Sequence, residues 1–499
     1  MMQELIAAID LGSNSFRLQV GRIVNDQIYP LDGLKESVRL AAGLGPDKML
    51  DQAAQLRGID ALRRFNERLS GFPSDSVRAV ATNTLRVAKN APSFLRQAEQ
   101  ALGFPIEVIA GREEARLIYV GVAHSLPDPH KRQLVVDIGG GSTEFIIGKS
   151  FEPQLLESLY MGCVSYSLNF FPDGRVDKRN LKDAELAARR ELQAIAHPYR
   201  EVGWERAVGS SGSAKALVDI LEQNGFSDSG ITREGLERLR AALLRAGSVD
   251  RLELAGLRAD RRPVLLGGFS IMSAVFKEFD LQRMVFSEGA LRLGVLYDLL
   301  GRYHHHDLRD ATVASFMARY GVDRRHADEV ADTALYLLGQ LDAERAQPDH
   351  PDARFLRWAA MLHEIGISVA HSSYHKHSAY ILDNADMPGF SRMDQGRLAR
   401  IVLAHRGKLE RVAALDPASP DWLLIACLRL AVVIHRARDG RGIPPLRVSR
   451  DGRNLEVVAN QSWLKRLPLT AAALEEEQRQ WQSVGRGLIL RAASGPLAA

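Results

Sequence analysis

Short strand-like runs alternate with helical segments over the first part of the chain. Glycine and Asn-Asp turns separate the earliest apolar runs, as in a β-meander, and apolar positions at helical spacing follow from residue 52. The pattern predicts strands at residues 5 to 9, 16 to 24, 27 to 30, 77 to 81 and 106 to 109, and helices at 52 to 70, 93 to 102 and 113 to 122. Because strands and helices interleave, we expect an α/β fold.

The alternation begins again after a proline-rich break at residues 127 to 129. It predicts a hairpin at 133 to 148, a helix at 178 to 196, a strand with a Gly/Ser turn at 208 to 213, and a helix at 232 to 244. From about 311 to 437 nearly every segment has a helical period, and β-branched runs and a charged helix follow. We therefore expect one lobe at residues 1–124, a second lobe at 125–302, an all-α domain at 303–440 and a small α+β domain at 441–499.

Two stretches of the chain read almost the same, namely IDLGSNSF at residues 9 to 16 and VDIGGGSTEF at 136 to 145. Each has an apolar run, an Asp at its end, a turn of small residues and a second apolar run, which predicts a β-hairpin with a tight turn. One such turn is equally well explained as a hairpin without a ligand. The duplication favours two facing turns that bind one phosphate, with Asp10 and Asp137 beside them to hold a hard cation such as Mg²⁺.

The composition indicates which kinds of partner and which compartment to expect. The 65 Lys and Arg residues against 61 Asp and Glu give a net charge of +4, so affinity for a polyanion must come from local clusters, and we expect no nucleic-acid partner. The two cysteines, Cys163 and Cys427, have no metal-type spacing, which favours a reducing compartment. Neither a signal peptide nor an apolar run of membrane-spanning length is evident, so we expect a cytoplasmic protein, with peripheral membrane association left open.

Six ordered motifs resemble those of the exopolyphosphatase and guanosine pentaphosphate phosphohydrolase (Ppx/GppA) family. They are AIDLGSNSFR at residues 8 to 17, ATNTLR at 81 to 86, GREEAR at 111 to 116, DIGGGSTE at 137 to 144, GSSG at 209 to 212 and SEGALR at 287 to 292. The resemblance continues in RWAAMLHE at 357 to 364 and HSAYIL at 377 to 382. It implies two actin-like lobes of the ribonuclease H-like, sugar kinase and chaperone ATPase superfamily, followed by an HD-like helical domain.

The resemblance also implies the chemistry, which is hydrolysis of a terminal phosphoanhydride bond with Mg²⁺. Glu114 matches the residue that acts on the attacking water, and Asp137, Glu144 and Asp10 match metal-associated positions. From the residues alone, Glu113 and Glu114 are better explained as ordinary carboxylates in the first turn of a helix. The phosphate-binding residues that we expect are Gly12, Ser13, Asn14, Ser15, Thr82, Asn83, Arg86, Gly139, Gly140, Gly141, Ser142, Thr143, Ser211 and Gly212. Stimulation by a monovalent cation such as K⁺ is left open.

The helical domain resembles an HD-type phosphohydrolase module that has lost its chemistry. Glu364 stands where the Asp of the His-Asp pair would stand, so we expect His363, His375, His405 and His435 to serve packing and polar contacts rather than a second metal centre. An arginine excess between residues 400 and 453 could hold a long polyanion or could be an ordinary solvated surface. The polyphosphate-channel candidates in this excess are Arg406, Lys408, Arg436 and Arg438.

The leading hypothesis is a Mg²⁺-dependent exopolyphosphatase that releases orthophosphate processively from inorganic polyphosphate. The near alternative is a guanosine-5'-triphosphate,3'-diphosphate (pppGpp) 5'-phosphohydrolase that uses the same residues. Two more distant alternatives are an ATP-dependent small-molecule kinase and a polyphosphate or alarmone sensor without turnover. The resemblance further implies a homodimer.

Overall fold

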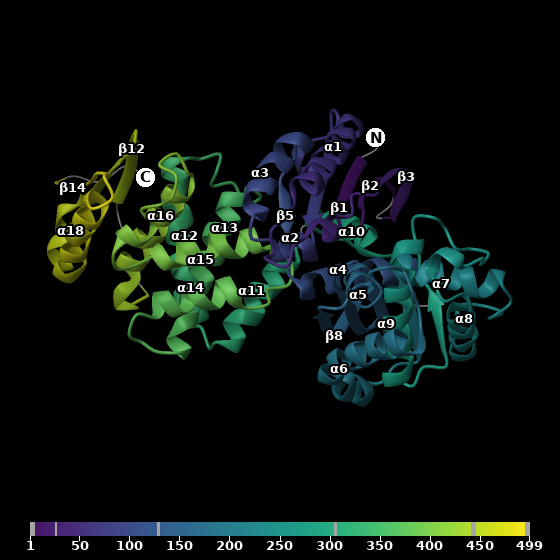
Figure 1. The fold of residues 1–499 in the computed structure, drawn as a ribbon. Coiled ribbons are helices and arrows are strands. Elements are labelled where there is room, and N and C mark those ends of the chain that lie inside the picture. Colours follow the sequence, from purple (N-terminus) through teal and green to yellow (C-terminus); the bar gives the residue numbers. More distant parts are fainter. Residues whose placement is uncertain (1–4, 25–26, 127–129, 304–306, 441–445, 495–499) are drawn as a thin grey trace. The chain divides into compact units, whose positions relative to one another are not determined.

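The computed structural model describes residues 5–24, 27–126, 130–303, 307–440 and 446–494 (Figure 1). The chain divides into two compact units, Met1–Asp307 and Leu308–Ala499. The division at 307 lies close to the expected boundary at 302. The finer division at 124 stays a prediction, and the boundary at 440 adjoins residues outside the described ranges.

The first unit contains a five-stranded mixed sheet in the order β3-β2-β1-β4-β5. Strand β1 pairs antiparallel with β2 and parallel with β4, and β2 pairs antiparallel with β3. The strands are β1 (Leu5–Leu11), β2 (Phe16–Val24), β3 (Gln27–Glu36), β4 (Val77–Ala81) and β5 (Ile106–Val108). The strands predicted from the alternating pattern are all present, and β1 and β3 are longer than predicted.

A six-stranded sheet in the same unit has the order β10-β11-β9-β6-β7-β8. Its strands are β6 (Gln133–Ile138), β7 (Thr143–Lys149), β8 (Glu152–Leu159), β9 (Arg206–Ser210), β10 (Ile231–Thr232) and β11 (Arg283–Phe286). Strands β6, β7 and β8 form consecutive antiparallel pairs, and β6 also pairs parallel with β9. This repeats the arrangement of β1, β2, β3 and β4, so the predicted duplication of the two turns extends to the sheets around them.

Helices cover both sheets of this unit. They are α1 (Gln52–Leu69), α2 (Asn83–Val87), α3 (Ala91–Leu102), α4 (Gly111–Ser125), α5 (Cys163–Phe170), α6 (Lys178–Val202), α7 (Ser211–Gln223), α8 (Arg233–Ala246), α9 (Leu265–Glu278) and α10 (Leu291–Tyr303). Helix α4 contacts β7, β8 and α10, and α10 contacts β1. Ile6 of β1, Ile118 of α4 and Ile146 of β7 accordingly share one buried cluster. Helix α4 is therefore anchored to both halves of the unit.

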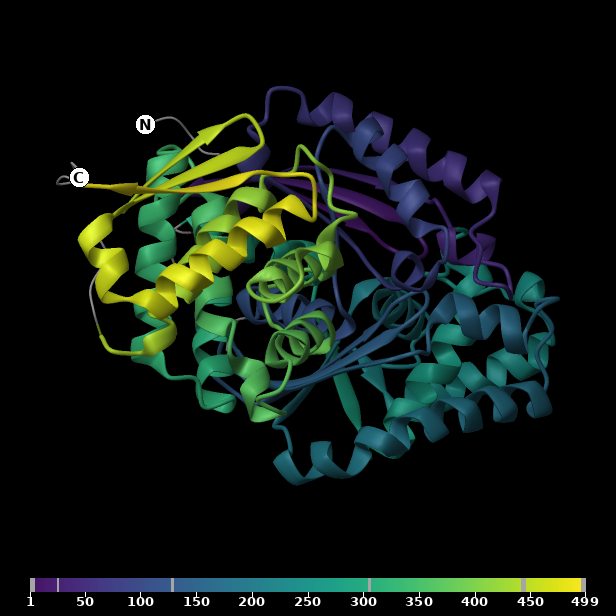
Figure 2. The same cartoon turned by 90° about the vertical axis from the view of Figure 1, so that its left-hand side faces the viewer.

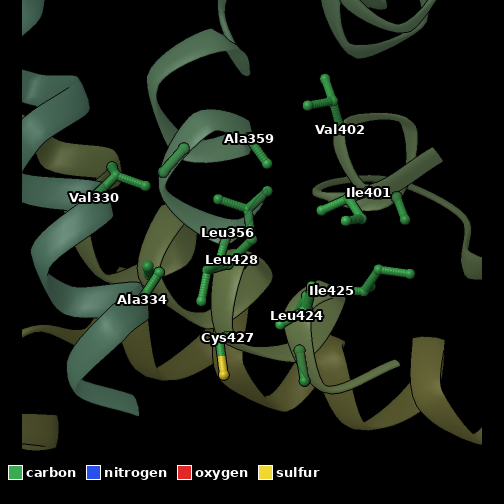
Figure 3. Close-up of a cluster of buried hydrophobic side chains, with 14 of the residues drawn as sticks. Val330, Ala334, Leu356, Ala359, Ile401, Val402, Leu424, Ile425, Cys427 and Leu428 are labelled. Atoms are coloured by element: carbon green, nitrogen blue, oxygen red, sulfur yellow. The ribbon is translucent and has the colours of Figure 1, made fainter. Parts of the chain in front are cut away.

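The second unit combines a helical core with a small sheet. Its main helices are α11 (Leu308–Arg319), α12 (Arg324–Leu341), α13 (Pro351–Leu362), α14 (Tyr374–Asn384), α15 (Arg392–Ala404) and α16 (Asp421–Ile434). Apolar side chains from α12, α13, α15 and α16 interlock in this core, among them Leu356, Ile401 and Leu428 (Figure 3). Burial of this apolar surface stabilises the unit.

The small sheet has the order β12-β13-β14 and confirms that strands follow the helical segment. Its strands are β12 (Leu446–Asp451), β13 (Asn454–Asn460) and β14 (Leu488–Ala493), and β13 is followed by α17 (Gln461–Arg466) and α18 (Pro468–Gln482). Helix α18 packs against β14 (Figure 2). No helix in the described part of the chain is long and apolar enough to cross a membrane.

Candidate active site

The two duplicated turns border one cavity of about 120 Å³ in the first unit. Many of the residues predicted from the sequence line it, namely Asp10, Gly12, Ser13, Asn14, Ser15, Thr82, Glu114, Asp137, Gly139, Gly140, Ser142, Ser211 and Gly212. These residues come from β1, β6, α4, α7 and the turns that follow β1, β4 and β6. Asp10 and Gly212 alone lie 202 positions apart, so the cavity gathers segments that are distant in the sequence.

The small residues allow the turns to approach each other closely. A Cβ atom at Gly140 would lie 2.9 Å from Ser13 Cβ, and one at Gly141 would lie 2.6 Å from Asn83 Oδ1. Ser13 Oγ in turn accepts a hydrogen bond of 2.8 Å from Thr84 Oγ1. Glycine is therefore required at these positions by the close approach of another chain segment.

Asp10 and Asp137 stand at the ends of the two equivalent strands β1 and β6 and line the same cavity. The pKa of Asp10 is raised to about 6, mainly by burial and also by the charge of Asp137, while Arg292 and Arg17 oppose the shift. Burial also raises the pKa of Asp137, although Ser210 Oγ donates a hydrogen bond of 2.6 Å to Asp137 Oδ2. Asp137 is buried and Asp10 is partly buried, and two carboxylates that repel each other at one cavity are a natural site for a cation.

Glu114 lies in the first turn of α4 and faces the cavity. Arg86 Nη1 donates a hydrogen bond of 2.9 Å to Glu114 Oε2. Burial nevertheless raises the pKa of Glu114 to about 7, with Arg86 opposing the shift and Asp10 and Asp137 adding to it. A carboxyl group with a pKa near neutrality can both accept and release a proton at physiological pH.

Glu113 is turned away from the cavity and belongs to a different network. Arg116 donates two hydrogen bonds of 2.8 Å to the Glu113 carboxylate and one of 2.5 Å to Asp298 Oδ1. These three side chains are buried. Consecutive residues of a helix point about 100° apart, so docking of α4 selects Glu114 for the cavity and Glu113 for structural support.

Glu144 lies behind the cavity rather than in its wall. It is paired directly opposite Asp137 in the β6–β7 ladder, is 1% exposed, and accepts a hydrogen bond of 2.8 Å from Ser158 Oγ. Burial and the charges of Glu114 and Asp137 raise its pKa well above the usual range. Glu144 therefore lies close enough to Glu114 and Asp137 for the three carboxyl groups to interact electrostatically.

Four other predicted phosphate-binding residues also lie outside the cavity wall, namely Asn83, Arg86, Gly141 and Thr143. Thr143 Oγ1 donates its proton to the carbonyl oxygen of Met161 at 2.5 Å. Arg86 holds Glu114 and donates to the carbonyl oxygen of Ile109 at 2.9 Å. The side chains of Asn83, Arg86 and Thr143 and the backbone of Gly141 therefore shape the site without lining the cavity.

Three arginines line the cavity that the sequence analysis did not count among the phosphate-binding residues: Arg17, Arg261 and Arg292. The pKa of Arg17 is lowered to about 10, mainly by burial and also by the charge of Arg292. Burial also lowers the pKa of Arg292. Partly buried arginines that repel one another favour an anion between them. Arg292 ends the SEGALR motif, which was a usable signal, whereas nothing in the sequence around Arg261 marks that residue.

Some basic residues of the second unit pair with carboxylates of the same unit and are not available to bind a polyanion. Arg438 pairs with Glu364 and Asp323, and Arg429 donates to Glu477 from Nε and Nη2. Arg406 lies 4.6 Å from the centroid of the Tyr374 ring. Lys408 and Arg436 are exposed. Ion pairs with carboxylates of the same unit therefore neutralise part of the arginine excess between residues 400 and 453.

Two family models cover most of the chain. The model of the Ppx/GppA phosphatase family matches residues 19–303, and that of Ppx/GppA phosphatase domain III matches residues 308–478. A relative in Vibrio vulnificus, named guanosine-5'-triphosphate,3'-diphosphate pyrophosphatase, is 39% identical over 97% of this chain and 98% of its own. A relative of the same name in Aeromonas hydrophila is 39% identical over 96% of this chain and 97% of its own.

Solved structures agree with these matches. An exopolyphosphatase from Cytophaga hutchinsonii is 26% identical, with a TM-score of 0.55 over 60% of this chain and 98% of its own. The Aquifex aeolicus member of the Ppx/GppA family is 26% identical, with a TM-score of 0.51 over 60% of this chain and 99% of its own. Matching family models over both units, together with relatives that span nearly the whole length, establish that this chain belongs to the Ppx/GppA phosphatase family.

Proposed function

We propose that this phosphatase hydrolyses the terminal 5'-phosphoanhydride bond of pppGpp. The observation that carries the choice of substrate is the 39% identity, over 97% of the chain, to a relative named for this nucleotide. In the reaction the oxygen of water forms a bond to the terminal phosphorus, and the bond from that phosphorus to the bridging oxygen breaks. The products are orthophosphate and the nucleotide that is shorter by one phosphate.

The residues around the cavity have complementary roles in this reaction. Glu114 orients the attacking water and accepts its proton, because its carboxylate faces the cavity and its pKa lies near 7. Arg17, Arg261 and Arg292 neutralise the charge of the phosphate groups. The turns after Asp10 and Asp137 offer backbone N–H groups to the phosphate oxygens. Phosphoryl transfer needs this kind of positioning and charge neutralisation more than a strong base.

Mg²⁺ fits the oxygen donors of the site. Asp10 and Asp137 are the carboxylates that would hold it from the cavity wall, with Glu144 behind Asp137. These three described residues do not bring three oxygen atoms within 4.8 Å of one another. That suits Mg²⁺, which binds one or two carboxylates and completes its shell with water and phosphate oxygens. When bound, the ion supplies positive charge for the phosphate group.

Inorganic polyphosphate is the second candidate substrate, and it was the leading one from the sequence. The likeness to the exopolyphosphatase structure, with 26% identity over 60% of the chain, supports it. The relatives that span nearly the whole chain are named for the nucleotide instead. They make pppGpp the first candidate substrate and polyphosphate the second. Both have a terminal phosphoanhydride bond that the same cavity residues can hydrolyse.

The deciding experiment compares kcat/KM for pppGpp and for long-chain polyphosphate with the purified chain and Mg²⁺, by phosphate release. A value at least tenfold higher for pppGpp is expected. A higher value for polyphosphate would reject the substrate choice while retaining the reaction. No release from either substrate by a folded protein would reject the reaction itself.

A further inference from the structure

Three side chains with metal-binding groups meet in the second unit. His326 on α12, His363 just after α13 and its neighbour Glu364 each place one ligand atom within 4.8 Å of the other two. The Nε2 atoms of His326 and His363 lie 4.0 Å and 3.9 Å from Glu364 Oε1. Their exposed fractions are only 5%, 0% and 9%. This is a buried cluster of two imidazoles and a carboxylate.

The orientation of His363 leaves a lone pair without a partner. Its Nδ1 atom lies 2.6 Å from the carbonyl oxygen of Ala360. Because a carbonyl only accepts hydrogen bonds, Nδ1 carries the proton and Nε2 carries the lone pair. Nε2 is buried and has no hydrogen-bond partner. A backbone carbonyl that fixes one ring nitrogen while the other stays available is the usual arrangement of a histidine that binds a metal.

His435 and His405 have ordinary partners, as the sequence analysis predicted, whereas His375 has a buried Nδ1 atom without a hydrogen-bond partner. His435 Nε2 lies 2.7 Å from Thr333 Oγ1, and His405 Nδ1 donates to the carbonyl oxygen of Val402 at 2.5 Å. His326, which the sequence analysis did not consider, has a buried Nδ1 atom without a hydrogen-bond partner. Because buried polar atoms in native proteins are normally satisfied, the unpaired Nε2 atom of His363 requires an explanation.

We propose that His326, His363 and Glu364 bind one divalent transition-metal ion of the Zn²⁺ or Co²⁺ class. Two imidazoles and one carboxylate are ligands that these ions accept, with a further position left for water. Ligand atoms about 2.1 Å from a tetrahedral ion lie about 3.4 Å apart. The present separations of 3.9 Å and 4.0 Å from Glu364 Oε1 are slightly wider, so binding requires the three side chains to move closer together.

Arg438 is the cation that competes for this site. Its Nη2 atom donates to the same Oε1 atom of Glu364, and its Nη1 atom lies 3.4 Å from Asp323 Oδ2. Its side chain is 42% exposed, so it can leave Glu364 for Asp323 and solvent. A guanidinium beside Glu364 repels a metal ion and occupies one of its ligand lone pairs. Arg438 therefore sets the affinity of the site.

The test titrates Co²⁺ into the full chain after treatment with a chelator, with visible absorption and calorimetry as the readouts. We expect one equivalent with the absorption of a histidine-ligated Co²⁺ ion, lost in Glu364→Gln and His363→Ala. Arg438→Gln should bind about tenfold more tightly because a competing charge is gone. His371→Ala removes an exposed histidine of the same unit and should bind as the wild type does.

Glutamine is nearly isosteric with glutamate, so Glu364→Gln keeps the shape of the side chain. The Co²⁺ that this variant still binds is bound elsewhere in the chain and is subtracted from the amount bound by the wild type. The gain in Arg438→Gln cannot arise from misfolding. The proposal is overturned if the wild type and Arg438→Gln bind Co²⁺ no better than Glu364→Gln. An unchanged affinity in Arg438→Gln would overturn the competing role of Arg438.

Discussion

Arg86 and Glu114 form a buried ion pair beside the cavity, with 2.9 Å between Nη1 and Oε2 and with 11% and 9% of the two side chains exposed. Burial still raises the pKa of Glu114 to about 7. The guanidinium therefore offsets only part of the cost of burying the carboxylate. The ion pair with Arg86 holds Glu114 beside the cavity, and the pKa of Glu114 lies close to neutral pH.

The first prediction concerns the role of Glu114 in catalysis. Glu114→Gln keeps the shape of the side chain but cannot accept a proton from water. We expect kcat to fall by about 10²–10⁴-fold, with a much smaller change in KM. Phosphate release with saturating substrate and Mg²⁺ measures it, and a rate near that of the wild type from a folded variant would rule out the role.

Glu113→Gln is the matched control on the same helix. Glu113 accepts hydrogen bonds from Arg116 and does not line the cavity. We expect this change to lower the free energy of unfolding, because it leaves a buried guanidinium partly unpaired, and to affect kcat far less than Glu114→Gln does. Equal losses of kcat in the two variants would contradict the division of roles.

The second prediction concerns the pH dependence of the rate. If ionised Glu114 receives the proton, kcat/KM falls as the pH drops through about 7. Arg86 lowers the pKa of Glu114, so Arg86→Gln should raise that pKa and move the acidic limb of the profile to higher pH. Arg112→Gln is the control, since Arg112 pairs with the partly exposed Glu157 on the protein surface. A limb that stays in place in Arg86→Gln would show that another group controls it.

The third prediction concerns the stability of the metal-free protein. The pKa of Glu114 rises from 4.5 to about 7 in the folded state, so folding favours the protonated form. The stability that this provides is fully present below pH 4.5 and is lost as the pH rises through 7. Glu114→Gln lacks this loss, so its free energy of unfolding relative to the wild type should increase by up to about 3 kcal/mol between pH 4.5 and pH 8. Urea unfolding at both pH values measures it, and a difference that does not grow with pH would contradict the shift.

The fourth prediction concerns Mg²⁺. Asp10→Asn and Asp137→Asn each remove one carboxylate from the cavity wall. We expect each change to raise the Mg²⁺ concentration for half-maximal activity by at least about tenfold, because Mg²⁺ binds through few carboxylates. Asp75→Asn removes an exposed carboxylate of the same unit and should leave the Mg²⁺ dependence unchanged. Unaltered Mg²⁺ dependence in both cavity variants would place the ion elsewhere.

The sequence predicted those features that depend on local pattern. The period of apolar residues gave the positions of strands such as β4 and helices such as α1, and the duplicated turns located the cavity. Arg261 could not be found in this way, because it approaches Gly212 only after distant segments pack. Glu114 lines the cavity and Glu113 does not, and this difference likewise depends on how α4 packs against the sheet and α10. The cluster of His326, His363 and Glu364 joins α12 to the end of α13, a contact that sequence spacing does not reveal.

The last prediction tests the packing that holds α4, and with it Glu114, in place. A Cβ atom at Gly294 of α10 would lie 1.7 Å from the carbonyl oxygen of Leu117 in α4. Gly294→Ala must push the two helices apart, so we expect it to destabilise the fold by about 3 kcal/mol or more and to lower kcat. At Gly339 of α12 an added Cβ would have its nearest neighbour at 3.7 Å.

Gly339→Ala therefore makes the same chemical change in a helix with room for it and should be neutral or stabilising by up to about 1 kcal/mol. Thermal unfolding and phosphate release on both variants provide the comparison. If Gly294→Ala is as stable and as active as Gly339→Ala, then close contact between α4 and α10 does not position Glu114.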